Sequence, residues 1–246
     1  MALSGTLINA ILIIAGSFAG LLFKKLMSER LKGTLLQAVG LIVIFVGIGG
    51  AVSATLTWTE GAFGTKDTLN MILSMVLGTL IGELINIEKH LDDFGAFCQK
   101  KLIRGDSKST FAEGFVTASL IFVVGAMAVV GSLDNGIRGD NSTLVAKGII
   151  DCITAAVLAS TLGIGVMLSA LPILLYQGSI ALLGVYIEPY LTEAVISQMS
   201  FTGSILIFAI GVNMLGLTKI KVGNMLPAIF MPIVFDLCTR LWNMLG

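Results

Sequence analysis

The chain has 246 residues, of which 56% are hydrophobic and only 12% are charged. Soluble domains carry about 25% charged residues. The composition therefore excludes a disordered protein, a nucleic-acid-binding protein and a small disulfide scaffold, and it predicts a chain whose main partner is the lipid bilayer. The 15 Lys and Arg residues balance the 15 Asp and Glu residues, so only their positions along the chain are informative.

Crossing the hydrocarbon core of a bilayer as a helix takes about 20 predominantly apolar residues. Eight stretches meet this length and predict an all-α polytopic transmembrane bundle that forms one integral membrane domain over residues 1–246. The fifth and sixth spans are divided near Gly163 and Gly165, because the run from Cys152 to Ile187 carries no charge and is too long for one span. The predicted spans cover residues 4–23, 34–57, 68–87, 111–133, 142–162, 165–187, 201–218 and 222–242.

Lys and Arg concentrate in cytoplasmic loops of membrane proteins. Three alternate connections hold eleven of the fifteen basic residues, whereas the opposite connections hold Lys66 and Arg138. We therefore expect a multi-pass protein of the bacterial inner membrane with both termini outside. Amphipathic rings prefer the membrane interface, and four fall at the predicted outer ends: Trp58, Tyr186, Tyr190 and Trp242.

Three further features of the sequence concern its first apolar stretch, its cysteines and its longest polar segment. Residues 4–23 have no charged segment before them and are interpreted as a retained span rather than a signal peptide. Cys98, Cys152 and Cys238 lack the spacing of a metal site and suggest no disulfide, so no metal or cofactor is expected. Residues 88–110 form a polar cytoplasmic loop whose apolar side chains favour an amphipathic helix on the inner leaflet.

Small residues four apart recur in the first and third spans, as Gly16 and Gly20 and as Gly78 and Gly82. This spacing lets helix backbones approach closely in lipid. One interpretation is packing alone, and the other is an internal duplication of helical hairpins, as in many transporters. The 29 glycines also favour a homo-oligomer.

Two longer segments, residues 122–140 and 159–179, together with Asn224-Met-Leu-Pro-Ala-Ile-Phe230, resemble the signature segments of the bacterial membrane-protein family of the YqgA and YdfK type. The resemblance covers essentially the whole chain. It implies a multi-span inner-membrane protein of transporter type, and it supplies neither a substrate nor an active site. Ala126 stands where relatives are expected to carry proline, which predicts that a helix kink is missing there.

A charge in the middle of a bilayer costs at least about 2.5 kcal/mol, and Lys147 and Asp151 both lie inside the fifth predicted span. Their spacing of four residues allows them to pair on one helix face. Asp151 lies about 15 Å along the axis from the start of the span, close to the midplane. The pair is interpreted either as a structural ion pair or as a site in which Asp151 binds a proton or a cation.

The next span carries Gly163, Gly165 and Pro172, which favour either a kinked helix or a broken, re-entrant one. Transporters commonly build binding sites from broken helices near the midplane. Neutral polar side chains that we expect to join Asp151 in such a site are Thr161, Ser169, Gln177 and, from the seventh span, Asn213.

Other acidic residues are expected to be less important. Glu83 and Glu113 lie near the predicted span ends and are interpreted as interfacial groups. Asp134, Arg138 and Asp140 form a short outer loop that is either a solvated hairpin or a vestibule that attracts cations. Asp236 lies deep enough in the last span to be a candidate ligand, although Arg240 four residues later offers it a local partner.

Enzyme motifs are missing from the sequence, including the paired histidines of zinc proteases, the phosphate-binding loop of ATPases and the serine elbow of hydrolases. The leading hypothesis is therefore a transporter or channel-like carrier of a small solute or ion, with Asp151 as the coupling or binding group. The alternative is a membrane scaffold or regulator that acts through residues 88–110. A lipid-handling enzyme is the third hypothesis.

Overall fold

The computed structural model describes residues 3–26, 28–59, 62–90, 93, 108–123 and 126–245. Most of the expected amphipathic segment at residues 88–110 lies outside these ranges. The described chain is almost entirely helical. Its helices are α1 (Ser4–Leu26), α2 (Glu29–Thr55), α3 (Thr68–Ile85), α5 (Lys108–Val123), α6 (Ala126–Ile137), α7 (Ser142–Leu162), α8 (Gly165–Leu168), α9 (Ala170–Ile187), η1 (Glu188–Tyr190), α10 (Glu193–Met214), η2 (Val222–Phe230) and α11 (Met231–Leu245).

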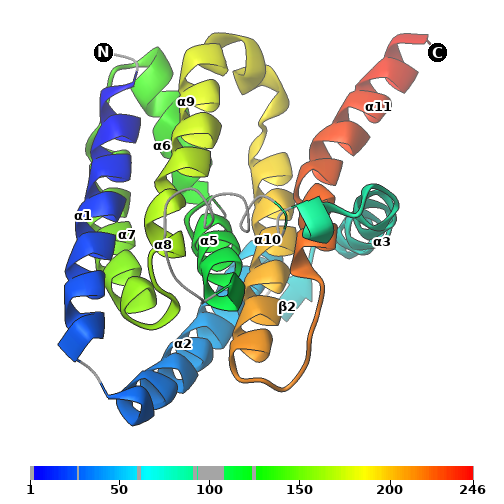
Figure 1. Cartoon of the computed structure of the whole chain (residues 1–246). Coiled ribbons are helices and arrows are strands. Elements are labelled where there is room, and N and C mark those ends of the chain that lie inside the picture. Colours follow the sequence, from blue (N-terminus) through cyan, green and yellow to red (C-terminus); the bar gives the residue numbers. More distant parts are fainter. Residues whose placement is uncertain are drawn as a thin grey trace.

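Within the described ranges, seven helices are long and apolar enough to cross a membrane, and the bent pair α5–α6 makes an eighth if it is counted as one span. The predicted all-α polytopic bundle is therefore confirmed. Figure 1 shows the N- and C-termini at the same end of the bundle, as an even number of crossings requires. α10 begins well before the predicted residue 201, because the Thr192 hydroxyl accepts a hydrogen bond from the Val195 amide and caps the helix at Glu193.

A short antiparallel hairpin interrupts the helical architecture between α2 and α3. Strand β1 (Leu56–Thr59) pairs with β2 (Ala62–Thr65) in a register that sets Leu56 opposite Thr65. A hairpin of this length is a connection rather than a layer of the fold.

The sharp helix break lies between α5 and α6, which are bent by 64° relative to each other. The expectation that Ala126 removes a kink is therefore wrong. The two halves pack against different partners: α5 approaches α8, where Gly165 adjoins the Phe111 carbonyl, and α6 approaches α9, where Gly136 adjoins the Ala181 carbonyl. Contacts with two separate helices, rather than a proline, account for the bend.

The region around Pro172 forms one span over Gly165–Tyr190 instead of a re-entrant loop. Ser169 keeps helical dihedral angles, with φ −61° and ψ −18°, so α8 leads into α9. Pro172 falls in the first turn of α9, where a missing amide proton is tolerated. The chain reverses direction before this span, at Gly163, whose φ of +89° favours glycine.

Glycines let three helix pairs approach closely. A β-carbon at Gly16 or Gly20 would collide with the Cys152 or Ala156 carbonyl of α7, and one at Gly78 or Gly82 would collide with Ala228 or Asn224 of η2. α2 and α10 are packed equally closely, since a β-carbon at Gly47 would lie 2.5 Å from the Phe208 amide nitrogen. The close helix approach expected of these glycine pairs is therefore confirmed, while both interpretations, packing alone and an internal duplication, stay open.

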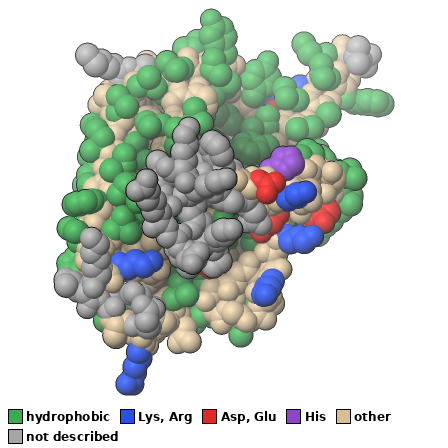
Figure 2. Space-filling view, viewed as in Figure 1, with side chains coloured by type: hydrophobic (Ala, Val, Ile, Leu, Met, Phe, Trp, Pro, Cys, Tyr) green, Lys and Arg blue, Asp and Glu red, His purple; other side chains and the backbone are tan. Residues whose placement is uncertain are grey.

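The outer surface of the bundle is apolar. Large side chains such as Phe45, Leu84 and Val185 are 79%, 87% and 70% exposed, and hydrophobic side chains cover much of the face drawn in Figure 2. In the same view, charged side chains gather beside the end of α3. A surface of this kind is stable in lipid and would aggregate in water.

Candidate functional site

Near the middle of α7, Lys147 and Asp151 form a buried ion pair. The Lys147 ammonium donates a hydrogen bond to the Asp151 carboxylate, and each side chain is only 7% exposed. The spacing of four residues sets both groups on one helix face. Both groups are buried inside the bundle, where α7 packs against α1 and α5.

α1 brings an amide side chain to this pair. Asn9 is fully buried, and its Nδ2 donates to Gln177 Oε1 of α9 at 3.3 Å and also bonds to the Asp151 carboxylate. The close approach depends on Gly148, because a β-carbon there would lie 3.2 Å from the Asn9 α-carbon. Three helices thus meet in one polar contact.

α5 contributes an aromatic ring. Phe122, which is fully buried and lies one residue before the end of α5, has its ring centroid 6.0 Å from Lys147 Nζ. A cation at this distance is attracted to the face of the ring. We call the five side chains the Asp151 cluster: Asn9, Phe122, Lys147, Asp151 and Gln177. The bend between α5 and α6 therefore begins beside a buried charge.

Two atoms of the cluster have no hydrogen-bond partner in the described chain, namely Asn9 Oδ1 and Gln177 Nε2. A buried polar atom without a partner costs about 1–3 kcal/mol, and such atoms are rare in native proteins. The first is an acceptor and the second is a donor. Within the described chain, the cluster thus keeps one acceptor and one donor that make no hydrogen bond.

Thr161, Ser169 and Pro172 lie outside the Asp151 cluster. Thr161 is ten residues after Asp151, about 15 Å along α7, and its hydroxyl bonds to the Leu158 carbonyl of its own helix at 2.9 Å. Ser169 is also bonded within its own turn, to the Val166 carbonyl at 2.6 Å, and precedes Gln177 by two helical turns. Pro172 presents no polar group to the cluster.

Asn213 and Asp236 also have other partners. The Asn213 side chain holds the turn after α10, since its amide donates to the Ile220 carbonyl and accepts from the Ile220 amide, both at 2.8 Å. Asp236 accepts from Arg240 Nε at 2.6 Å, and Arg240 also donates to the Pro189 carbonyl at 2.7 Å. These bonds fasten connections between helices.

Glu83 at the end of α3 belongs to a second polar network. It pairs with Lys221 at 3.1 Å and accepts from the Asn224 amide, while the Glu88 carboxylate accepts from the Gly223 amide nitrogen at 2.6 Å. The network joins α3 to the start of η2 and agrees with the interpretation of Glu83 as a helix-end group.

A third polar group lies where α6 meets α7, near the start of α1. The Asn141 side chain accepts from Ser4 at 3.0 Å and from Asn135, which is fully buried. At the adjacent Asp140, hydrogen bonds from the backbone and side chain of Ser142 hold the carboxyl pKa below its ordinary value. These contacts hold the junction between α6 and α7 against the start of α1.

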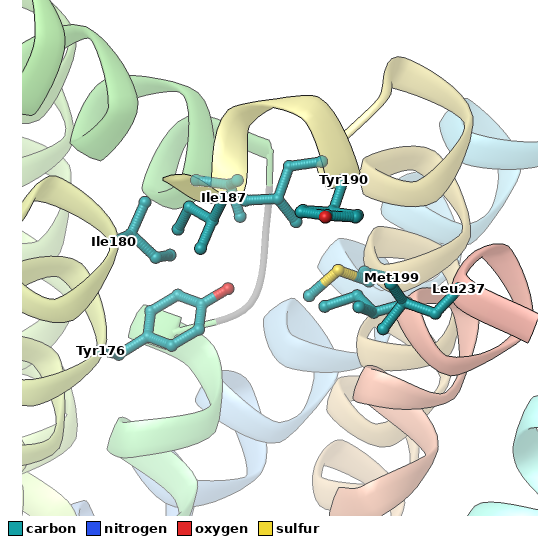
Figure 3. Close-up of a pocket in the computed structure, with 9 residues that line it drawn as sticks. Tyr176, Ile180, Ile187, Tyr190, Met199 and Leu237 are labelled. Carbon is teal, nitrogen blue, oxygen red and sulfur yellow. The ribbon is translucent and has the colours of Figure 1, made fainter. Parts of the chain in front are cut away.

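An apolar cavity of about 310 Å³ lies between α6, α9, α10 and α11. Figure 3 shows the Tyr176 hydroxyl pointing into this space, opposite Met199 and Leu237, with Tyr190 at its rim. One residue of the cavity lining, Tyr176, directly precedes Gln177 of the Asp151 cluster in α9. Among the described residues, no group of three His, Cys, Asp or Glu side chains has the geometry to hold a metal ion.

The structure thus brings Lys147, Asp151 and Gln177 of the predicted site together and adds Asn9 and Phe122, which the sequence did not single out. Asn9 carried a usable signal, since it is a polar residue inside an otherwise apolar predicted span, and such residues are commonly functional or paired. Phe122 carried none, because a phenylalanine in an apolar helix is unremarkable.

The sequence of the chain is similar to one protein family and to two bacterial proteins. Residues 4–237 match the family described as "Protein of unknown function (DUF554)". The chain is 34% identical over 228 residues to the uncharacterized membrane protein YdfK of Bacillus subtilis (strain 168), covering 93% of each chain. It is 28% identical over 242 residues to the uncharacterized protein YqgA of Escherichia coli (strain K12), covering 97% of this chain and 98% of the relative. No solved structure is significantly similar to it.

Proposed function

The chain belongs to the DUF554 family, and from that premise we propose that it is a carrier, not an enzyme, which moves a small solute or ion across a membrane. The observation that carries the proposal is the Asp151 cluster. It sets an ion pair and two amides in the middle of an apolar bundle, with one donor and one acceptor unpartnered. A scaffold that acts through its cytoplasmic loop has no need of such a polar cluster inside the bundle.

The energetics of the ion pair support a ligand site over a structural brace. Replacing a buried ion pair by apolar residues of similar volume is often neutral or stabilising, so Lys147 and Asp151 are poor devices for stability. Their order along α7 is also the less favourable one, since an acid four residues before a base suits the helix dipole better. The pair therefore needs another reason to be there.

The bend between α5 and α6 supports the same proposal. Carriers commonly form binding sites beside interrupted helices near the midplane, and here Phe122 at the end of α5 covers Lys147. A change in the 64° angle would move this ring relative to the ammonium group. We assign the bent pair the role of opening the cluster to one side. The chain is proposed to work as an oligomer in the bacterial inner membrane, with both termini outside.

The test is flux through the purified chain in liposomes, with Na⁺, K⁺, urea, acetamide and glycerol as probes. The double variant Lys147→Met with Asp151→Leu removes both charges of the pair and replaces them by apolar side chains. We expect it to remain folded and to slow the flux of the transported probe at least about tenfold, as removal of a buried polar ligand does. The single variant Asp151→Asn gives the same direction of change.

The matched control is Asp236→Asn, which neutralises a carboxylate in a second pair of the same spacing outside the Asp151 cluster. It is expected to leave the flux unchanged. Wild-type chain that moves none of the five probes, or a double variant as fast as wild type, would overturn the carrier proposal. Charge reversal within residues 88–110 then becomes the next experiment, because it tests the scaffold alternative.

A further inference from the structure

Charge balance in the Asp151 cluster restricts what it can bind. Lys147 and Asp151 neutralise each other. Glu113 of α5 lies nine residues before Phe122, about 13.5 Å along the helix, and the charged groups of α1 and α6 that the structure describes have other partners. Lys24 of α1 donates to the Thr161 carbonyl at 3.2 Å, and Asp134 of α6 pairs with Arg138 at 2.9 Å. An added ion would therefore remain uncompensated in a low-dielectric interior, which is strongly disfavoured.

The two amides of the cluster form half of a mutual pair. Two facing primary amides can exchange two hydrogen bonds, each donating to the other's carbonyl oxygen. Here one bond is made, from Asn9 Nδ2 to Gln177 Oε1 at 3.3 Å, and the second is open, which leaves Gln177 Nε2 and Asn9 Oδ1 unpartnered. Both side chains are fully buried. The open half presents a donor and an acceptor from two different helices.

We propose that the ligand of the Asp151 cluster is a small uncharged molecule that carries a hydrogen-bond donor beside an acceptor, as primary amides, urea and polyols do. Its acceptor binds Gln177 Nε2 and its donor binds Asn9 Oδ1, so that it bridges α1 and α9. The inference rests on the proposed carrier function and narrows its substrate from a solute or ion to an uncharged solute.

The ion pair then has a positioning role. The Lys147 ammonium holds the Asp151 carboxylate beside the Asn9 side chain, whose Nδ2 is bonded to Gln177 Oε1. The direction of the Asn9 carbonyl is thereby fixed, because its Nδ2 edge is already occupied. A ligand meets a preorganised acceptor, which lowers the cost of binding.

The experiment measures the uptake of uncharged probes and of ions by the wild-type protein, by two variants of the cluster and by a control variant outside it. Uptake of urea, acetamide and glycerol is followed by liposome swelling, and uptake of Na⁺ and K⁺ by entrapped indicator dyes. Gln177→Leu and Asn9→Leu each remove one side of the open pair. We expect each to slow uptake of the uncharged probe at least about tenfold. The control Gln198→Leu, at a buried glutamine of α10 outside the cluster, is expected to leave uptake unchanged.

The outcomes separate this inference from the proposed function. Na⁺ or K⁺ flux that depends on Asp151, without uptake of an uncharged probe, overturns the inference and leaves the carrier standing. Wild-type liposomes that pass only water, or none of the probes, overturn both. If a leucine variant fails to fold, the selectivity of the wild-type chain between urea and Na⁺ decides the matter without any variant.

Discussion

Two acid–base pairs with the same spacing lie in very different surroundings in this chain. Lys147 and Asp151 on α7 are 7% exposed each, whereas Asp236 and Arg240 on α11 are 25% and 41% exposed. The α11 pair has the acid before the base, the favourable order on a helix, and it fastens α11 to η1 through the Pro189 carbonyl. The α7 pair has neither advantage, and it faces two amides with unpartnered atoms instead.

The difference shows that a spacing of four residues does not by itself distinguish a structural ion pair from one that belongs to a ligand site. An exposed pair keeps much of its hydration, so its contribution to stability is small and it can be lost at little cost. A buried pair has given up that hydration, and each member then depends on the other. The same substitution, aspartate to asparagine, should therefore lower the free energy of unfolding by very different amounts in the two pairs.

The largest effect is expected for Asp151→Asn. It leaves the Lys147 ammonium buried without a counter-charge, and breaking a buried pair in this way costs about 3–5 kcal/mol of the free energy of unfolding. Equilibrium unfolding in mild detergent measures the loss. A loss below about 1 kcal/mol, as for an exposed pair, would contradict the burial of the cluster.

The control is the double variant Lys147→Met with Asp151→Leu, which replaces both charges. Its loss in free energy of unfolding is expected to be smaller than that of Asp151→Asn, because no buried charge is left without a partner, and it includes only the cost of fitting a leucine larger than the aspartate. Stability that survives the double replacement while flux is lost would separate the ligand role of the pair from any structural one.

A medium effect is expected for Gly148→Ala, which tests how closely α1 must approach the α7 pair. The added β-carbon would meet the Asn9 α-carbon at 3.2 Å and the Leu12 side chain at 2.8 Å. Overpacking of this kind typically costs about 1–3 kcal/mol, measured by the same unfolding experiment. The control Gly49→Ala lies in α2 with nothing within 4 Å of the new β-carbon, and it should gain about 0.5–1 kcal/mol, the usual preference of a helix for alanine.

The sequence alone predicted both ion pairs and most of the membrane spans. Charges inside apolar stretches identified Lys147, Asp151 and Asp236, and the four-residue spacing predicted the local pairs correctly, because both features depend on one helix only. Seven of the eight predicted spans correspond to single long apolar helices for the same reason, since helix length and hydropathy are local properties. Features that depend on a single stretch of the chain are those that the sequence predicts well.

Features that depend on two or more segments were harder to predict. Asn213 has a side chain suited to a ligand site, but the turn at Ile220 folds back to occupy it. Asn9 joins the cluster only because Gly148 lets α1 approach α7. The bend between α5 and α6 follows from contacts with α8 and α9 rather than from a proline. Each of these outcomes is decided by which helices become neighbours, and the local pattern does not contain that information.

The smallest effect is expected for Asp236→Asn. The carboxylate is part-exposed, so its pair with Arg240 contributes at most about 1 kcal/mol, and Arg240 keeps its bond to the Pro189 carbonyl and its place 5.4 Å from the Tyr190 ring centroid. Salt sharpens the contrast, because ions screen exposed charges and leave buried ones largely unaffected. Raising the salt from about 0.1 M to 1 M shortens the screening length from about 10 Å to 3 Å, and unfolding measured at both concentrations should then show the Asp236→Asn deficit shrinking while the Asp151→Asn deficit stays. Equal salt dependence at the two positions would mean that water reaches both pairs, and the distinction between brace and site would fail.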